Sequence, residues 1–420
     1  MVESGMSMFS TLIESTGYNQ TDIRLYNLGV IFRTIREAKN ISRAELAKVT
    51  GLNPATITHI VRELIEHGLI EQAGSNESRS GRPSVQLRVR SQAGYVIAVH
   101  LDRYFMRGMI TNLGLEECTR SEVLALPSSS PSQINIATLI QLIENLITDS
   151  GIPREKFFGI GICAPGPLDA QHGVLFSPPN FPGWPNLPVR QILQDHFHLQ
   201  TFLDQDANAC ALAEKMFGGM REAQNFVFLL ADGGLGGGIF VHGNIYRGSS
   251  NTAGEIGHTT IALDGPQCSC GNTGCLELYA SPHAVEQYVA ERLGTNGHSD
   301  WFPTPDSITF EKITEAARAG HPLSKEALQR MASALAAGMV NVVNAFDPEA
   351  IVIGGKIALA QDIIGPVITQ TIQQRSLNGS TAPVPVCFTS LGQEAQIIGA
   401  FSLVLRELFQ NPAVAREGVR

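Results

Sequence analysis

The spacing of apolar residues divides the chain into two regions of different character. Between residues 23 and 35, apolar side chains recur every three or four positions, as on one face of an α-helix. Shorter helical segments follow, and then two strand-like stretches at 69–71 and 85–89. From residue 95 onward, short apolar runs alternate with helical patterns. The pattern therefore predicts a small helical domain that ends in a β-hairpin, followed by a large α/β region.

Start and stop signals locate the short helices of the first region. Ser42 and Glu45 have the spacing of a capping box, which begins a helix, and Gly51 suits the C-terminal cap of that helix. Asn53 and Pro54 then begin a further helix. Two helices joined by a glycine-containing turn are typical of a helix-turn-helix, and the hairpin that follows predicts a wing.

The helix that begins at Asn53 carries the predicted DNA-reading face. Ile57, Ile60 and Leu64 repeat at helical spacing and must pack inward, so the opposite face is left for a DNA groove. We expect DNA contacts from residues on these helices and in the wing, namely Arg43, Ala55, Thr56, Thr58, His59, Arg62, Arg79 and Arg82. One such domain engages few phosphates, which favours a dimer on a two-fold operator. A small helical bundle with a solvated basic face is the alternative.

The charge distribution agrees with a DNA-binding domain on an otherwise acidic protein. The formal net charge of -9 over 420 residues argues against a protein coated in basic side chains. Residues 22–90, however, contain eleven lysines and arginines against seven aspartates and glutamates, a balance of +4. Because two glutamates precede this segment, residues 91–420 carry -11. The segment with the helix-turn-helix signals is therefore the basic part of the molecule.

The composition indicates a globular protein with more than one domain. Hydrophobic residues make up 43% of the chain and charged residues 16%, so its 420 residues can bury more than one core. No apolar run reaches the length of a membrane span, and the first ten residues lack the basic start and apolar centre of a signal peptide. We therefore expect a cytoplasmic protein without membrane insertion.

The seven cysteines are an odd number, which does not suit a disulfide framework. Three of them crowd into eight residues, at Cys268, Cys270 and Cys275. The other four stand singly among apolar residues, at Cys118, Cys163, Cys210 and Cys387. This pattern predicts one metal site and a set of buried thiols.

Four segments of the second region resemble one known family. They are Asp-Gly-Gly-Leu-Gly-Gly-Gly at 232–238, Ala-Gly-Glu-Ile-Gly-His at 253–258, Cys-Ser-Cys-Gly-Asn-Thr-Gly-Cys-Leu-Glu at 268–277 and Ile-Val-Ile-Gly-Gly at 351–355. With the N-terminal domain, they resemble the repressor branch of the ROK family of sugar kinases and sugar-responsive repressors, over residues 22–420. The resemblance implies an α/β protein in which a two-lobed, actin-like ATPase and sugar-kinase fold follows the winged helix-turn-helix, usually as a homodimer or homotetramer. The expected domains are a tail over 1–21, the winged helix-turn-helix over 22–90, a first lobe over 91–203 plus 391–420, and a second lobe over 204–390.

The cysteine-rich segment is the predicted metal site. His258, Cys268, Cys270 and Cys275 supply one imidazole and three thiolates, a soft tetrahedral set suited to zinc. Four protein ligands leave no open position for a reactive water, so the zinc would be structural. Three reduced cysteines without a metal are the alternative.

The resemblance also implies a sugar site in the cleft. Sugar hydroxyls need rigidly held acceptors and donors, which carboxylates and an imidazole supply. The implied sugar-binding residues are Gly166, Asn180, Asp206, Glu255, His258 and Glu277. Asp206 stands at the position of the family's catalytic base, and His258 would use one ring nitrogen for zinc and the other for the sugar. Gln205 replaces the asparagine typical of the kinases, which leaves the identity of the sugar open.

Two phosphate-binding segments of the family's kinases are altered in this chain. Their Asp-x-Gly-Gly-Thr turn corresponds to residues 100–104, where the leading carboxylate and both glycines are missing and Arg103 would obstruct the turn. A second turn, Gly-Thr-Gly in the kinases, reads Asp-Gly-Gly at 232–234, which places a negative charge where phosphates would lie. We therefore expect a sensor that binds a sugar or sugar phosphate without phosphorylating it.

The predicted function is a transcriptional repressor of carbohydrate-use genes that binds operator DNA and takes a sugar or sugar phosphate as effector. Ligand in the cleft would change the affinity for DNA because it binds one lobe arrangement better than another. An ATP-dependent sugar kinase of hexokinase type with an accessory DNA-binding domain is a rival prediction, with Asp206 as its catalytic residue. A repressor controlled mainly by a protein partner, such as a sugar-transport component, is a second rival.

Overall fold

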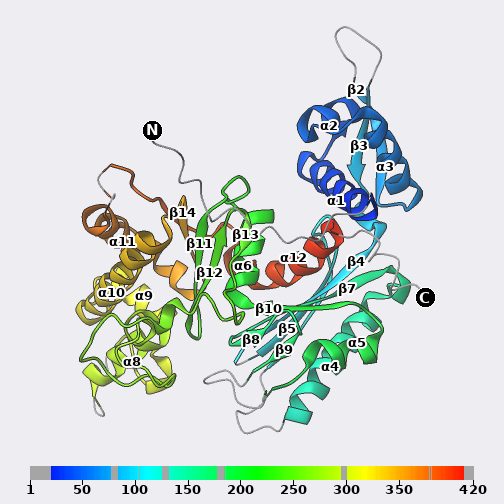
Figure 1. The fold of residues 1–420 in the computed structure, drawn as a ribbon. Coiled ribbons are helices and arrows are strands. Elements are labelled where there is room, and N and C mark those ends of the chain that lie inside the picture. The colour runs from blue at the N-terminus through cyan, green and yellow to red at the C-terminus, as the bar shows by residue number, and fades with distance from the viewer. Residues whose placement is uncertain are drawn as a thin grey trace, which may run out of the picture. The chain divides into compact units, whose positions relative to one another are not determined.

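The structure is a computed structural model that describes residues 20–76, 84–103, 105–124, 132–176, 184, 186–294, 300–377, 379 and 381–410. The chain forms two compact units, which are described separately below (Figure 1). The first unit comprises Met1–Ala93 and Arg406–Arg420, and the second comprises Gly94–Leu405. None of the described helices is both long enough and apolar enough to cross a membrane.

The first unit is a winged helix-turn-helix, as predicted. Its elements are α1 (Gln20–Ala38), β1 (Ile41–Ser42), α2 (Arg43–Thr50), α3 (Pro54–Glu66), β2 (Ile70–Asn76) and β3 (Ser84–Val89), and the last residues of α12 (Ala395–Gln410) join them. Strands β2 and β3 pair antiparallel as the hairpin of the wing. Strand β1, which the apolar pattern did not predict, pairs antiparallel with β3.

The predicted helix signals of this unit are confirmed. The side chain of Ser42 accepts the amide of Glu45, whose carboxylate accepts the Ser42 amide at 2.8 Å, which completes the capping box. Gly51 ends α2 in the left-handed conformation, with φ of 68°. Asn53 begins α3, because its Oδ1 accepts the amide of Ala55 at 2.8 Å.

The core of the first unit lies between the three helices and the wing. Apolar side chains from α1, α2, α3 and β3 are almost entirely buried there: Ile31, Phe32, Ile35, Leu46, Ile57, Ile60, Val61, Leu64 and Leu87. The end of α12 completes this core, since the ring of Phe409 lies edge-on to that of Phe32, with 5.4 Å between the ring centroids.

The second unit contains two five-stranded sheets. The first sheet has the order β10-β7-β4-β5-β6, with β4 (Tyr95–Leu101), β5 (Phe105–Asn112), β6 (Glu117–Leu124), β7 (Phe157–Ala164) and β10 (Thr201–Gln205). The second has the order β13-β12-β11-β14-β15, with β11 (Phe226–Ala231), β12 (Leu235–Val241), β13 (Asn244–Ile245), β14 (Ala350–Gly354) and β15 (Val386–Phe388). Strands β4, β7 and β10 run parallel, as do β11, β14 and β15. A short hairpin, β8 (Leu168–Asp169) with β9 (Val174–Leu175), follows β7.

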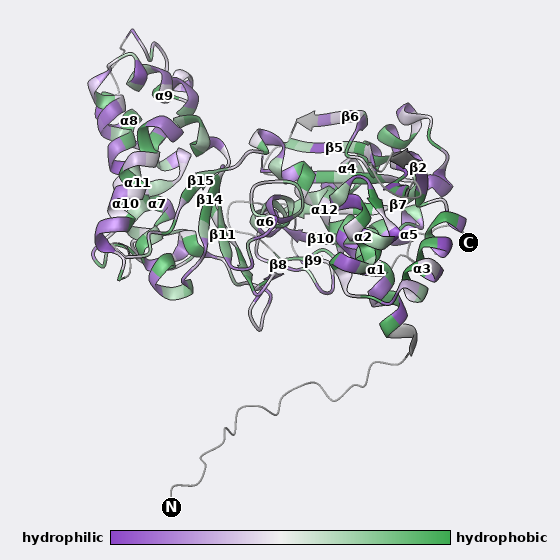
Figure 2. Cartoon of the chain, turned by 90° about the horizontal axis from the view of Figure 1, so that it is seen from above, coloured by the Kyte–Doolittle hydropathy of each residue, from purple (hydrophilic) through white to green (hydrophobic). Residues whose placement is uncertain are grey.

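Helices cover the sheets of the second unit in layers. Helices α4 (Ser132–Ser150) and α5 (Val189–Phe197) pack on one face of the first sheet. Helices α6 (Asp206–Met216) and α12 pack on one face of the second sheet. Its other face is covered by α7 (Glu277–Ala280), α8 (Pro282–Leu293), α9 (Phe310–Arg318), α10 (Pro322–Phe346) and α11 (Gln361–Arg375). Strands β11 and β14 of this sheet are largely hydrophobic, as Figure 2 shows, because both of their faces are covered.

Close backbone approaches hold α6 and α12 against the strands. A Cβ atom on Gly238 of β12 would lie 2.3 Å from the carbonyl oxygen of Ala207 in α6. A Cβ atom on Gly161 of β7 would lie 1.9 Å from the carbonyl oxygen of Ala400 in α12. Because only glycine permits contacts this short, α6 lies close against the second sheet and α12 close against the first.

One expectation about the cysteines is wrong. Cys163 and Cys210 are buried and Cys387 is half-buried, but Cys118 is exposed. Cys118 lies on β6, the edge strand of the first sheet, where the pairing with β5 shifts from Ile110–Thr119 to Thr111–Glu117. The shift leaves Cys118 without a cross-strand partner in a bulge on the edge strand, which an apolar sequence neighbourhood does not reveal.

Candidate functional site

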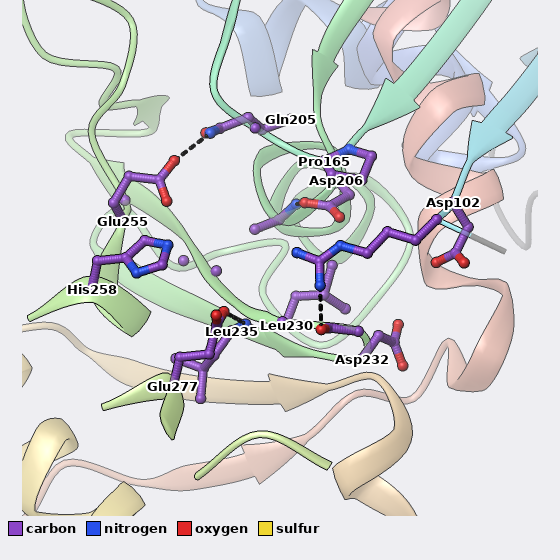
Figure 3. A pocket seen from close by; sticks show the side chains of 18 of the residues that line it. Asp102, Pro165, Gln205, Asp206, Leu230, Asp232, Leu235, Glu255, His258 and Glu277 are labelled. Carbon is purple, nitrogen blue, oxygen red and sulfur yellow. Dashed lines mark hydrogen bonds between the residues drawn. The ribbon is translucent and has the colours of Figure 1, made fainter. Parts of the chain in front are cut away.

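A pocket opens in the second unit where the ends of the first sheet's parallel strands meet the turn between β11 and β12. Its lining residues are His100, Asp102, Arg103, Pro165, Gly166, Gln205, Asp206, Ala207, Leu230, Asp232, Gly233, Gly234, Leu235, Gly236, Gly237, Gly254, Glu255, His258 and Glu277. Figure 3 shows that Glu255, His258 and Glu277 lie on one side of the pocket, and Asp102 and Asp232 on the other. Asp206 lies between the two groups. Ligand sites in open α/β sheets typically form at the carboxyl ends of parallel strands, as here.

Asp206 is the first residue of α6, directly after β10, and its Oδ1 accepts the amide of Ala207 at 2.7 Å. Burial raises the pKa of Asp206 to about 7, with the charges of Asp232 and Asp102 acting in the same direction, against the Ala207 amide and Arg103. The carboxyl group can therefore accept or donate a hydrogen bond near neutral pH.

The two other predicted carboxylates are each held by a hydrogen bond. Glu255 Oε1 accepts the side-chain amide of Gln205 at 2.8 Å, which joins the end of β10 to the segment after β13. Glu277, at the start of α7, accepts the backbone amide of Leu235 at 2.8 Å. Both carboxylates are thus preorganised, and each keeps one oxygen with which it can bind a sugar hydroxyl.

The opposite side of the pocket contains a second acidic group. Asp232 follows β11, and its carboxylate accepts the backbone amide of Lys356 at 2.7 Å and the side-chain amide of Gln396. Burial raises the pKa of Asp232, and the charge of Asp102 adds to the effect. His100 also lines the pocket, and burial lowers its pKa to about 3, so its ring is neutral.

A buried ion pair supports the pocket from behind. Asp204 on β10 is only 1% exposed and pairs with Arg247, which follows β13. Asn208 on α6 also donates to Asp204, at 3.2 Å. Arg247 precedes the turn that leads to Glu255, and its carbonyl oxygen accepts the amide of Ala253 at 3.0 Å. The pair therefore ties the strand that carries Asp206 to the segment that carries Glu255.

The four predicted metal ligands come together beside the pocket. The ligand atoms of His258, Cys268, Cys270 and Cys275 all lie within 4.8 Å of one another. Cys270 Sγ is 3.7 Å from Cys275 Sγ, and Cys268 Sγ is 3.7 Å from Nδ1 of His258. Ligands about 2.3 Å from a tetrahedral zinc ion are separated by about 3.8 Å, so the cluster has suitable dimensions. Nδ1 faces the thiols, which leaves Nε2 of His258 for the pocket that this residue lines.

The structure brings five of the predicted sugar-binding residues together. Gly166, Asp206, Glu255, His258 and Glu277 line the pocket described above, whereas Asn180 lies outside the described residues. The pocket also contains residues that were not assigned to it as sugar-binding: His100, Asp102, Arg103 and Asp232. In the sequence, these four residues were marked only by their position in the two segments that differ from the phosphate-binding turns of the kinases. The expected loss of a carboxylate there is incomplete, because Asp102 lines the pocket next to the substituted His100.

The predicted DNA-reading face is exposed on the first unit. Ala55, Thr58, His59 and Arg62 of α3 are exposed, and Thr56 and Arg43 are half-buried. Arg79 and Arg82 lie outside the described residues. The hydroxyl of Thr58 donates to the carbonyl of Pro54 at 2.8 Å. This bond uses the hydroxyl's proton within the helix.

Comparisons with known proteins agree with this architecture. A family model described as ROK family matches residues 102–407, and one described as winged helix-turn-helix DNA-binding matches residues 29–71. The chain is 31% identical over 400 residues to the xylose repressor of Caldicellulosiruptor bescii, across 94% of this chain and 100% of that protein. It is 28% identical to the DNA-binding transcriptional repressor Mlc of Escherichia coli, across 94% of this chain and 96% of Mlc.

Solved structures give the same result. A ROK family transcriptional regulator, a homolog of E. coli Mlc, matches with a TM-score of 0.82 at 30% identity, over 95% of this chain and 99% of that one. A ROK family glucokinase from Streptomyces griseus, in complex with glucose and AMPPNP, matches with a TM-score of 0.65 at 25% identity, over 73% of this chain and 98% of that one. The chain belongs to the ROK family. Within that family it is a sugar-responsive transcriptional repressor.

Proposed function

We propose that this repressor binds operators of carbohydrate-use genes as a homodimer or homotetramer in the cytoplasm, and that a monosaccharide in the pocket changes its affinity for DNA. The observation that carries the proposal is the coexistence, in one chain, of an exposed polar face on α3 and a pocket of fixed carboxylates. A sugar that binds one arrangement of the pocket better than another shifts the equilibrium between DNA-binding and released states.

Operator reading is assigned to the exposed face of α3. Arg62 and His59 are long enough to reach phosphates or base edges, and the Ala55 side chain can contact a thymine methyl group. Because the Thr58 hydroxyl already donates to Pro54, its methyl group is also a candidate for apolar contact with a base. Arg43 at the start of α2 and the wing residues Arg79 and Arg82 are proposed to bind the DNA backbone.

Sugar binding is assigned to one side of the pocket. Asp206, Glu255, His258 and Glu277 offer acceptors and a ring nitrogen to adjacent hydroxyl groups, as polyol recognition requires. Gly166 and Asn180 are proposed to complete this side. When a sugar binds, the hydrogen bond from Gln205 to Glu255 either remains or is replaced by a hydrogen bond to the sugar. This bond is therefore proposed to take part in the response to the sugar.

We infer that the pocket binds sugar without phosphorylating it. Asp206 is suited by position and pKa to remove a hydroxyl proton. However, Asp232 and Asp102 occupy the side on which phosphate groups would lie, and their negative charges oppose a nucleotide. A coupled assay with ATP and glucose, N-acetylglucosamine, N-acetylmannosamine or xylose should give no turnover at enzyme-like rates. Turnover in the range of about 1 to 1000 per second would show a kinase instead.

The cluster of His258, Cys268, Cys270 and Cys275 is proposed to hold a structural zinc ion. Four protein ligands close the site, so the zinc would fix the loop that carries His258 beside the pocket. Cys270→Ser should abolish the zinc that copurifies with the chain and lower its thermal stability, as elemental analysis and thermal unfolding would show. The exposed Cys118→Ser variant is the control and should keep the metal. Unchanged zinc content in Cys270→Ser would refute the assignment.

The proposed function is tested by its two binding activities. Selection of genomic fragments by the purified chain should enrich a short two-fold repeat, and the substitution Arg62→Ala should weaken the enrichment. Thermal unfolding with a panel of monosaccharides should show stabilisation by at least one of them, because a ligand that binds the folded state raises its stability. A chain that enriches no sequence at low salt is not an operator-binding repressor.

A further inference from the structure

Arg103 reaches across the pocket and occupies the glycine turn between β11 and β12. It follows β4 of the first sheet, and its Nη1 donates to the carbonyl oxygen of Gly233 at 2.5 Å. A Cβ atom on Gly234 would lie 3.1 Å from Nη2 of Arg103, and one on Gly233 would lie 3.5 Å from its Cδ. The arginine side chain therefore lies along both glycines, and larger residues there would crowd it.

The hydrogen bonds of this turn are arranged for a cation. A glycine-rich turn binds an anion through backbone amides that are free to donate. Here the amide of Leu235 already donates to Glu277 at 2.8 Å, while the carbonyl of Gly233 is directed at Arg103. The turn thus presents an acceptor to the guanidinium and gives one of its donors to a carboxylate of the protein.

Carboxyl groups outnumber the single guanidinium in the described lining of the pocket. Arg103 is the one lysine or arginine among the described residues that line the pocket. The same lining contains five carboxyl groups, those of Asp102, Asp206, Asp232, Glu255 and Glu277. A phosphate group that entered the pocket would meet more negative than positive charge, and the single cation would have to leave its carbonyl partner to bind it.

We propose that Arg103 is a specificity-determining residue of the pocket. Its guanidinium occupies the glycine turn at which an anionic group of a ligand would otherwise bind, and so restricts the pocket to uncharged sugars. The inference deepens the proposed function and rests on it. Because Arg103 comes from the first sheet and Gly233 from the second, the same contact also holds the two sides of the pocket together. Arg103 is therefore also a positioning residue for sugar binding.

The test compares each sugar with its own phosphate. Isothermal titration calorimetry on the full chain would use D-glucose with glucose 6-phosphate, N-acetylglucosamine with its 6-phosphate, and D-xylose with xylose 5-phosphate. The wild-type chain should bind at least one uncharged sugar about tenfold or more tightly than the matching phosphate. A wild-type chain that binds a phosphate as tightly as its parent sugar, or more tightly, would overturn the inference without any variant.

Variants of Arg103 distinguish a residue that holds the two sides of the pocket together from a residue that binds anionic ligands. Arg103→Gln should weaken binding of the uncharged sugar about tenfold, and Arg103→Lys should restore part of the loss, because it keeps the charge without the planar fork. Arg292→Gln, at an exposed position of α8, is the control and should leave affinity unchanged. Selective loss of phosphate binding in Arg103→Gln would show an anion receptor and overturn the inference. Binding of no sugar or phosphate at all would contradict sugar sensing itself, and the inference with it.

Discussion

Asp206 is a pocket residue whose pKa is shifted close to neutral pH. Its carboxyl group lies between the side of the pocket with Glu255, His258 and Glu277 and the side with Asp102 and Asp232. Its pKa is raised to about 7, mainly by burial. The unfolded chain releases this proton near pH 4. Between these two values the folded state binds more protons than the unfolded state, so this group makes stability fall as the pH rises toward 7.

The first prediction follows from this fall in stability with rising pH. Asp206→Asn should stabilise the chain relative to wild type at about pH 8, where the wild-type carboxylate is ionised and buried, and the gain should shrink at about pH 5. Thermal unfolding of both chains at the two pH values measures the difference. Asp264→Asn, at an exposed position outside the pocket lining, is the control. An Asp206→Asn gain that is the same at both pH values would contradict the raised pKa.

For single residues, the sequence identified polar side chains of the pocket better than the residues to which they form hydrogen bonds. Glu255 and Glu277 could be assigned because they lie in short motifs that resemble those of the ROK family. The contact between Arg103 and Gly233 joins residues 130 positions apart, and no local pattern encodes it. The same holds for the pair of Asp204 with Arg247, which depends on the packing of two separate sheets.

Among the elements, helices α1, α2 and α3 and the end of α12 form one packed core. The closest contact is at Gly29 of α1, where a Cβ atom would lie 1.6 Å from the carbonyl oxygen of Phe409. Helix boundaries in this unit could be predicted, because Ser42, Gly51 and Asn53 act locally. The packing of α12 on α1 could not, since its residues stand at the far end of the sequence. Strand β1 was also missed, because two residues are too few to show a period.

The second prediction concerns Gly29. In an unconstrained helix, replacing glycine with alanine stabilises by about 1 kcal/mol. Here Gly29→Ala should instead destabilise the chain by about 1–3 kcal/mol and weaken operator binding, because the methyl group forces α1 away from Phe409. Denaturant unfolding and operator titration measure the two effects. Glu37→Ala, an exposed position of α1, is the control, and equal stabilisation in both variants would contradict the close contact.

For the whole molecule, the net charge of -9 separates into a basic segment of +4 over residues 22–90 and -11 over residues 91–420. Such a division leaves phosphate contacts to the winged helix-turn-helix, while the rest of the chain repels DNA. Operator affinity should therefore depend on a small number of basic side chains.

The third prediction is a salt dependence. The logarithm of operator affinity should fall linearly with the logarithm of salt concentration, and Arg62→Ala should reduce the slope by about 1 for each DNA-binding domain engaged, if Arg62 contacts a phosphate. Arg292→Ala on α8 should leave the slope unchanged. A slope in Arg62→Ala equal to that of wild type would remove this residue from the DNA backbone contacts.

The coupling between the pocket and DNA is measured by operator binding with and without an uncharged sugar, using fluorescence anisotropy on one labelled operator. A sugar that stabilises the chain should weaken operator binding at least about fivefold, a coupling of about 1 kcal/mol. Glu255→Gln, whose side chain lies in the pocket and not in the winged helix-turn-helix, should bind the operator normally and lose the response. Operator affinity that no sugar changes, in a chain that demonstrably binds the sugar, would contradict the coupling of pocket to DNA.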